Sequence, residues 1–303
     1  MRRLLAIALS SALLACDAPP APTPPPAVPL RPPTPKPPAP PPRQTVKLRW
    51  RLPPEGPRTL DVEVVADPKR RSGMFDLRAI GGPKSELKLP TRTESLAVVT
   101  RRPETDQFLV AVIPTAIEGE GLVAGVRADP KKLQSLIGTV TGRTSMNENG
   151  FLGTELDASS RSLFGTALEL PAQPVGVGDT WSSSVEPVWI EGGTWASDKK
   201  SHRNTYTLKS IDTQPDGTHV AVIAFTNHED DTGHFKDKSG IPRPATFSGA
   251  LDGHGEFLVE GGSWRSLEFT QSTRISGMGE LELARTVKVK TVDLPAKYAE
   301  LVK

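Results

Sequence analysis

Cysteine, aromatic residues and surplus charge are all scarce in this sequence. Its 303 residues include one cysteine, and aromatic residues make up 5% of the chain. A single cysteine excludes an internal disulfide and any metal site built from several thiolates. The chain has 37 basic and 35 acidic residues, and the first fifteen residues hold two arginines and no acid, which leaves 35 of each sign after them. This neutrality argues against nucleic-acid binding, which needs a concentrated basic surface.

The chain also lacks an apolar run long enough to cross a bilayer as a helix. The run from Leu4 to Ala15 follows two arginines, which is the layout of a secretory signal. It ends in Leu13-Leu14-Ala15-Cys16, and this stretch resembles the lipobox of bacterial lipoproteins. The resemblance implies a signal peptide over residues 1–15, cleavage after Ala15, a lipid on the Cys16 sulfur and acylation of the new amino terminus.

The predicted location is therefore the bacterial cell envelope, with the protein anchored to a membrane by its lipid and facing the periplasm. The outer membrane is favoured. Asp17 resembles the inner-membrane retention signal of enteric bacteria, but this rule differs between bacterial groups, so the inner membrane stays open. A plain secretory signal, or an uncleaved anchor with a bystander cysteine, is the alternative interpretation.

A proline-rich segment follows the cysteine and ends near Arg43. Prolines at this density favour polyproline II, which rises about 3.1 Å per residue, so an extended segment spans on the order of 80 Å. Residues 16–43 are predicted to be the lipidated cysteine and a stiff tether. The alternative is a proline-rich ligand for a partner, which is less favoured because Arg31 and Lys36 stand alone without a repeated motif.

From Thr45 onward, apolar and polar residues alternate with a period of two, which predicts strands with one buried face. Val46, Leu48 and Trp50 form the first such set. Two runs, 108–113 and 220–225, are apolar at every position and are predicted to be central strands covered on both faces. The expected strands are 45–52, 59–64, 74–80, 86–89, 95–100, 108–113, 139–146, 151–156, 181–190, 204–211, 219–227, 246–251, 256–260, 264–275 and 280–292.

Two segments fit short helices instead, at 130–137 and 159–168. Residues 44–303 are therefore predicted to be a mainly β domain with a large antiparallel sheet or sheets, arranged as a sandwich or a curved half-barrel. The domain is either one unit or two halves, 44–157 and 172–303. A curved sheet around a short helix would be similar to the half-barrel lipid carriers of bacterial envelopes.

The most distinctive motif of the β domain is Pro174-Val175-Gly176-Val177-Gly178-Asp179-Thr180-Trp181. With the strands around it and the late glycine-rich pair 253–264, it resembles the uncharacterised bacterial exported families typified by the domain-of-unknown-function 6263 group. The resemblance covers residues 44–292 and brings no catalytic residue. The residues themselves indicate a structural role: the glycines permit a close approach, Asp179 can accept backbone N–H groups, and Trp181 can anchor the next strand.

Residue patterns that carry chemistry are few. His228 to His234 is the densest set of potential metal ligands, but its histidines are six apart with a glycine between them, so a solvated loop is favoured and no metal is predicted. Ser197 to Lys200 fits Ser-x-x-Lys in a polar stretch, and Glu280 and Glu282 fit a wet sheet face. The sequence predicts no catalytic residue, no cofactor and no enzyme activity.

Trp189 and Trp195 flank Gly192-Gly193 in a predicted hairpin. Two tryptophans near a loop tip could stack on a sugar or contact a lipid or another hydrophobic ligand, which makes them candidate ligand contacts. The favoured alternative is a cross-strand aromatic pair at the edge of the core.

These observations predict a lipid-anchored envelope protein that binds an apolar or amphipathic ligand in a sheet-lined cavity, without catalysis. The alternative is a tethered protein–protein interaction or assembly module with an envelope protein as partner. An interior apolar cavity would favour the first function. A dry core with an exposed apolar patch would favour the second.

Overall fold

The computed structural model describes most residues from Arg43 to Val302. The described ranges are 43–54, 56–76, 84–102, 105–123, 126–128, 130–156, 158–186, 195–236, 241–277 and 279–302. The predicted signal peptide, Cys16 and nearly all of the tether lie outside them. The chain from Arg43 onward forms one compact unit by its contacts. Within the described residues, none of the helices has the length and apolar character needed to cross a bilayer.

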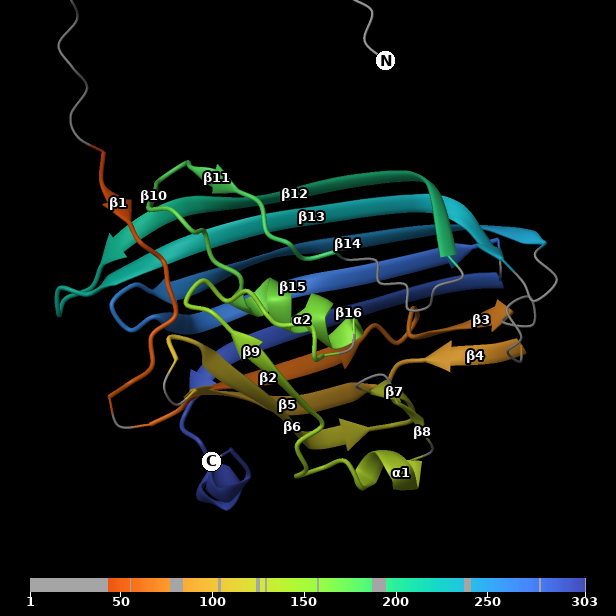
Figure 1. The fold of residues 1–303 in the computed structure, drawn as a ribbon, viewed down its shortest axis with the longest axis horizontal. Helices are drawn as coiled ribbons and strands as arrows, with labels where there is room; N and C mark the ends of the chain where they lie inside the picture. The colour runs from red at the N-terminus through yellow and green to blue at the C-terminus, as the bar shows by residue number, and fades with distance from the viewer. Residues whose placement is uncertain are drawn as a thin grey trace, which may run out of the picture. The chain divides into compact units, whose positions relative to one another are not determined.

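One large antiparallel sheet of twelve strands dominates this unit and curves around helix α2 (Figure 1). Its path is β11-β12-β13-β14-β15-β16-β2-β5-β6-β9, and β3 and β4 attach beside β16. The prediction of a mainly β fold with a large antiparallel sheet and short helices is thus confirmed, in its curved form. The strands are β1 (Thr45–Val46), β2 (Arg58–Ala66), β3 (Ser72–Asp76), β4 (Lys84–Lys88), β5 (Arg92–Arg101), β6 (Phe108–Glu118), β7 (Gly121–Val123), β8 (Val126–Ala128), β9 (Gly142–Met146), β10 (Val175–Gly176), β11 (Thr180–Trp181), β12 (Trp195–Thr213), β13 (His219–Lys236), β14 (Pro242–Leu258), β15 (Ser263–Ser276) and β16 (Gly279–Val292). The helices are α1 (Pro130–Gln134), α2 (Ala158–Leu168) and the 3-10 helix η2 (Ala296–Val302).

The main core lies between α2 and the face of the sheet that α2 covers, which we call the α2 side. Phe164, Ala167 and Leu168 of α2 are buried there. Trp50 Nε1 donates to Leu168 O at 2.6 Å, and Trp264 Nε1 donates to Ala167 O. The last carbonyls of a helix have no partner within the helix, so the two indoles satisfy groups that would otherwise be buried without a donor.

A smaller core lies on the opposite face, which we call the η2 side. Leu96, Val98, Ala111 and Ile113 of β5 and β6 pack there against Tyr298 and Val302 of η2. The prediction that 108–113 is covered on both faces is therefore confirmed. The same prediction for 220–225 holds on one face only, because Val222 and Ala224 are half-buried. Strand β13 is the third strand from the edge that β11 forms, so it is not central in the sheet.

The first expected strand, 45–52, is wrong as a strand beyond Val46, although its alternating burial is right. Leu48 and Trp50 are buried. β1 pairs with β10 in a separate two-stranded sheet. After β1 the backbone bonds to loops, since Trp50 N donates to Glu148 O at 2.8 Å and Arg51 N to Gly262 O at 3.0 Å. The expected strand 151–156 is also wrong, with a single bridge between Met146 and Leu152. Alternation reports which side chains are buried, and it does not report what the backbone pairs with.

Candidate functional site

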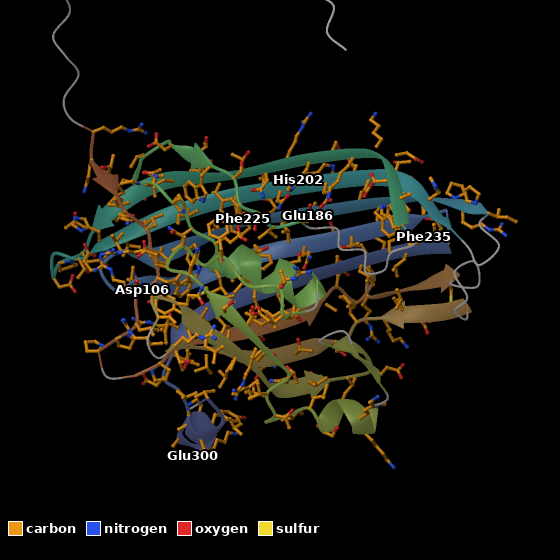
Figure 2. All side chains as sticks on the ribbon, in the orientation of Figure 1. Asp106, Glu186, His202, Phe225, Phe235 and Glu300 are labelled. Atoms are coloured by element: carbon orange, nitrogen blue, oxygen red, sulfur yellow. The ribbon has the colours of Figure 1, made fainter. Side chains whose placement is uncertain are left out.

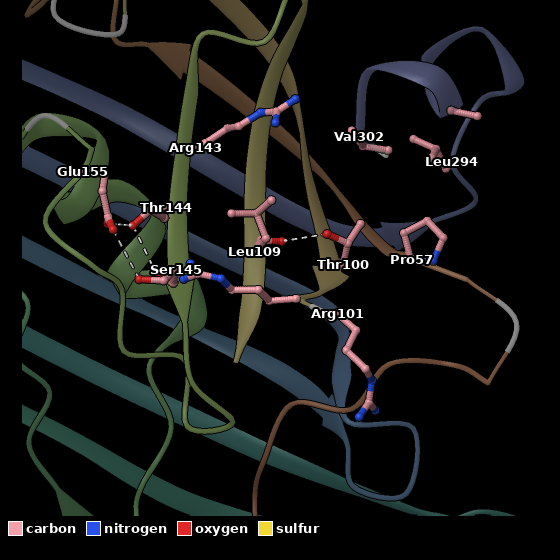
Figure 3. Close-up of a pocket in the computed structure, with 12 residues that line it drawn as sticks. Pro57, Thr100, Arg101, Leu109, Arg143, Thr144, Ser145, Glu155, Leu294 and Val302 are labelled. Carbon is pink, nitrogen blue, oxygen red and sulfur yellow. Dashed lines mark hydrogen bonds between the residues drawn. The ribbon is translucent and has the colours of Figure 1, made fainter. Parts of the chain in front are cut away.

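A pocket of about 850 Å³ lies where β5, β6 and β9 meet the C-terminal segment. Figure 3 shows Leu294 and Val302 on one side of it and Thr144, Ser145 and Glu155 on the other. Its volume falls within the range of about 300–1,000 Å³ that small-molecule sites occupy. The pocket is lined by Pro57, Thr100, Arg101, Arg102, Leu109, Arg143, Thr144, Ser145, Glu155, Leu294, Ala299 and Val302.

The apolar wall of this pocket comes from the sheet and from the C-terminal segment. Leu109 faces the η2 side, because its neighbours Phe108 and Val110 belong to the core on the α2 side and successive side chains of a strand alternate. Val302 packs in the smaller core. Arg143 Nη2 donates to Leu301 O at 2.8 Å and so fastens η2 beside β9. The wall is therefore part of the folded core and exists without a ligand.

The charges of the pocket are unequal. Three arginines against one glutamate leave a formal surplus of two positive charges. Arg101 ends β5 and Arg102 follows it, and within the described part of the chain neither guanidinium has a hydrogen bond or an ion pair. Thr144 Oγ1 donates to Glu155 Oε2 at 2.7 Å, and this bond is the first cause that holds the pKa of Glu155 below its usual value. Glu155 is thus ionised at neutral pH.

A second polar cluster lies on the α2 side, where the start of β12 pairs with the last residues of β13; we call this the far end of the two strands. Asp231 is 5% exposed and accepts hydrogen bonds from Trp195 Nε1 at 3.1 Å and from Ser197 Oγ at 2.6 Å. His202 Nε2 lies 2.8 Å from Asn227 Oδ1, and Asn227 Nδ2 donates to Val185 O at 2.8 Å. Figure 2 shows Glu186 and His202 between Phe225 and Phe235 of β13. The buried side chains of Asp231 and Asn227 thus have hydrogen-bond partners, as is usual for buried polar groups.

Lys200 carries the positive charge of that cluster. Its Nζ lies 2.8 Å from Glu229 Oε1 and 2.8 Å from Glu186 Oε1, and Glu229 is 1% exposed. Burial by itself would lower the pKa of Lys200, but the two carboxylates outweigh it and raise the pKa to about 12. A lysine with this pKa is a permanent cation at neutral pH, which suits an ion pair and not a proton donor or nucleophile.

Glu169 is a buried carboxylate directly after α2. It is 6% exposed, and its oxygens accept hydrogen bonds from the backbone N–H of Ser184 at 2.6 Å and from the Ser184 hydroxyl. Burial raises the pKa of Glu169, and the Ser184 bonds offset part of that rise. These bonds join α2 to the segment 182–186. The same segment is hydrogen-bonded to β12, because Ser183 N–H donates to Asn204 Oδ1 and Asn204 Nδ2 donates to Ser183 O. Glu169 therefore holds two parts of the fold together.

Of the residues that the sequence singles out for ligand contact or lipidation, one can be placed. Trp195 is half-buried, and its ring lies 4.9 Å from that of Phe235 and 4.8 Å from that of Phe247 between centroids. These contacts support the core-edge alternative for Trp195. Trp189 and Cys16 lie outside the described residues, so their roles stay predictions.

The prediction of a solvated loop at 228–234 is wrong, because these residues lie inside β13. The alternation of a strand sends Glu229 and Asp231 into the α2 side, while His228 pairs with Asp230 at 3.0 Å on the other face. Across the described residues, no three His, Cys, Asp or Glu side chains form a group that could hold a metal ion. The Ser-x-x-Lys pair is likewise part of a strand, β12.

The motif 174–181 has the structural role that its residues indicate. Asp179 Oδ2 accepts the Gly176 N–H at 2.7 Å, and its Oδ1 accepts a bond from Arg43 at 2.6 Å. Gly178 has a φ of +86°, and Trp181 stacks on Tyr206 with centroids 5.7 Å apart. Because β1 pairs with β10, the motif also binds the chain where the tether ends.

Sequence reasoning missed the pocket residues Arg101, Arg102 and Arg143. The adjacent pair Arg101-Arg102 at the end of an apolar run was the available signal, since the connecting segments that follow strands often carry binding residues. Nothing local could place Arg143 or the C-terminal residues beside them, because that proximity depends on pairing between β6 and β9 and on the docking of η2.

No family model matches this chain, and no curated protein matches it in sequence. The resemblance based on residues 174–181 therefore stays an expectation.

Proposed function

We propose that this protein is a lipid-anchored bacterial envelope protein that binds an apolar or amphipathic ligand without catalysis. The observation that carries the proposal is the pocket between β5, β6, β9 and η2, which combines an apolar wall with cationic side chains. A concave site with apolar walls and a few convergent polar groups is the usual form of a ligand site.

The α2 side of the sheet supports placing the ligand in this pocket and not under the helix. Phe164 and Leu168 of α2, together with Trp50 and Trp264, fill the space over the centre of the sheet. Toward the far end of β13, the buried Asp231 and Glu229 make the surface polar. An apolar ligand there would have to displace packed side chains or face buried charge.

The test is native mass spectrometry of the full chain carrying Cys16→Ser, purified from cells without detergent. We expect lipid-sized adducts, and we expect Ala299→Glu to remove them because it places a charge on the pocket wall. Adducts that persist in the variant, or that are absent from both proteins, would contradict the proposal.

The anchor has its own test. Because residues 13–16 resemble a lipobox, the native chain should fractionate with membranes and carry the mass of acyl chains on Cys16. Cys16→Ser should move it to the soluble fraction. A native chain that is soluble and has no added mass would show that the anchor is not used.

The second candidate is a tethered assembly module for an envelope partner. The filled core on the α2 side supports it, as do exposed apolar side chains such as Val65, Met74 and Ile241. Chemical crosslinking in intact cells should then trap a protein partner, and a change of these three residues to serine should abolish the crosslink.

A further inference from the structure

The charges around the pocket distinguish among the apolar and amphipathic ligands of the proposed function. We infer that the pocket binds a long-chain carboxylate of the fatty-acid type, with its acyl chain on the apolar wall and its head at Arg101 and Arg102. This inference rests on the proposed function, because it names the ligand class of the same pocket.

The head group is assigned by the two arginines at the end of β5. A guanidinium presents a planar fork of N–H donors that matches a carboxylate in a bidentate pair. Arg143 uses one of its donors on Leu301 O. The guanidinium groups of Arg101 and Arg102 have no hydrogen bond or ion pair within the described residues, although both residues line the pocket. Among the described residues, nothing occupies the N–H donors of these two guanidinium groups.

Glu155 decides which way the ligand lies. Its pKa is held low by the Thr144 hydroxyl, so it is negative at neutral pH and repels a carboxylate from the β9 side of the pocket. The surplus of positive charge lies with Arg101 and Arg102. A carboxylate head is therefore placed at the end of β5.

The apolar residues that line the pocket indicate where the acyl chain of the ligand lies. Leu109, Leu294, Ala299 and Val302 give an apolar wall between β6 and the C-terminal segment. Burial of a hydrocarbon chain against such a wall contributes roughly 25 cal/mol for each Å² removed from water. A short carboxylate such as acetate lacks this contribution, so head and chain are both needed for tight binding.

The experiment compares three amphiphiles that share one alkyl chain. Dodecanoate, dodecyl maltoside and dodecyltrimethylammonium are titrated below their micelle concentrations into the full chain carrying Cys16→Ser, by calorimetry. Charge-assisted hydrogen bonds predict that dodecanoate binds at least about tenfold more tightly than the other two. Acetate is the control for the chain and should give no measurable binding.

Substitutions locate the effect. Arg101→Gln with Arg102→Gln should weaken dodecanoate about tenfold or more and leave dodecyl maltoside unchanged. Arg203→Gln, an exposed change on the distant strand β12, is the matched control and should change neither. A urea midpoint equal to that of the parent confirms that each variant is folded.

The outcomes separate this inference from the proposed function. If the neutral or cationic amphiphile binds as tightly as dodecanoate, and Ala299→Glu abolishes that binding, the carboxylate is refuted while the pocket keeps its proposed function. If the double arginine variant binds dodecanoate normally, the assigned head position is wrong. If none of the three amphiphiles binds, the proposed function fails and the inference fails with it.

Discussion

The hydrogen bond from Trp50 to the end of α2 provides a quantitative test of how the helix is held in the sheet. Leu168 is fully buried, and its carbonyl accepts the Trp50 Nε1–H at 2.6 Å. Trp50→Phe keeps an aromatic ring and removes the donor. A buried carbonyl left without a partner costs about 1–3 kcal/mol, and the space that the smaller ring leaves adds roughly 1 kcal/mol. We expect a total loss of about 2–4 kcal/mol in the free energy of unfolding.

The same substitution at Trp181 is the matched control. Trp181 Nε1 is buried and has no hydrogen-bond partner among the described residues, and its ring stacks on Tyr206. Trp181→Phe removes a donor that satisfies nothing, so we expect a loss of about 1 kcal/mol or less. Both variants are measured by urea unfolding of the full chain carrying Cys16→Ser, with the slope of the transition checked for constancy. If Trp50→Phe costs no more than Trp181→Phe, the bond to Leu168 does not stabilise the fold.

Two further predictions concern stability. Gly253→Ala should lower the free energy of unfolding, measured in urea, by about 1–3 kcal/mol, because Phe269 of β15 occupies the space that a Cβ would need. Gly56→Ala is the control, since its Cβ meets nothing within 4 Å and the change should be close to neutral. Equal effects of the two substitutions would be inconsistent with this account. The raised pKa of Glu169 means that the folded chain holds the carboxyl proton more tightly than the unfolded chain does. The contribution of Glu169 to stability is therefore greatest below its unfolded pKa of about 4.3, and it falls as the pH rises through its pKa in the folded chain. Glu169→Gln should remove that fall and gain stability relative to the parent above this window, and a pH profile of the urea midpoint that the substitution leaves unchanged would refute the assignment.

The fold class could be predicted because period-two burial is a local property. The strands β2, β5 and β15 lie where alternation places them, and the helix expected at 159–168 forms as α2. Gly165 weakens that helix by propensity, but it lets the helix pack closely on Val185, because a Cβ there would lie 3.0 Å from Val185 Cγ2. Packing against the segment 182–186 decides in favour of the helix, which propensity alone could not show.

The lengths of the late strands could not be predicted, because polar residues and glycines interrupt the apolar alternation inside these strands. Gly253 and Gly255 lie inside β14, and a Cβ at Gly255 would lie 2.7 Å from Trp264 Cζ3. Likewise, Glu229 and Asp231 lie inside β13 because Lys200, Trp195 and Ser197 of β12 satisfy them. In each case, a residue about 10–35 positions away in the sequence packs against or bonds to the polar residue or glycine, so the strand can continue through it. A local sequence pattern does not contain that distant residue.

Different residues of the sheet serve stability and the proposed ligand binding. Near the C-terminal end of β13, the ion pair of Lys200 with the buried Glu229 and the hydrogen bonds of the buried Asp231 stabilise the sheet. At the centre of the sheet, α2 and two tryptophans pack on it, so the residues of both regions already contribute to the fold. The side chains of the pocket residues Arg101 and Arg102 make no hydrogen bond or ion pair within the described part of the chain. Residues that fold a protein are coupled to many neighbours, whereas residues with no internal partner can change without cost to the core. A loss of ligand at unchanged stability, on substitution of those two arginines, is therefore the signature that this architecture predicts for a binding protein.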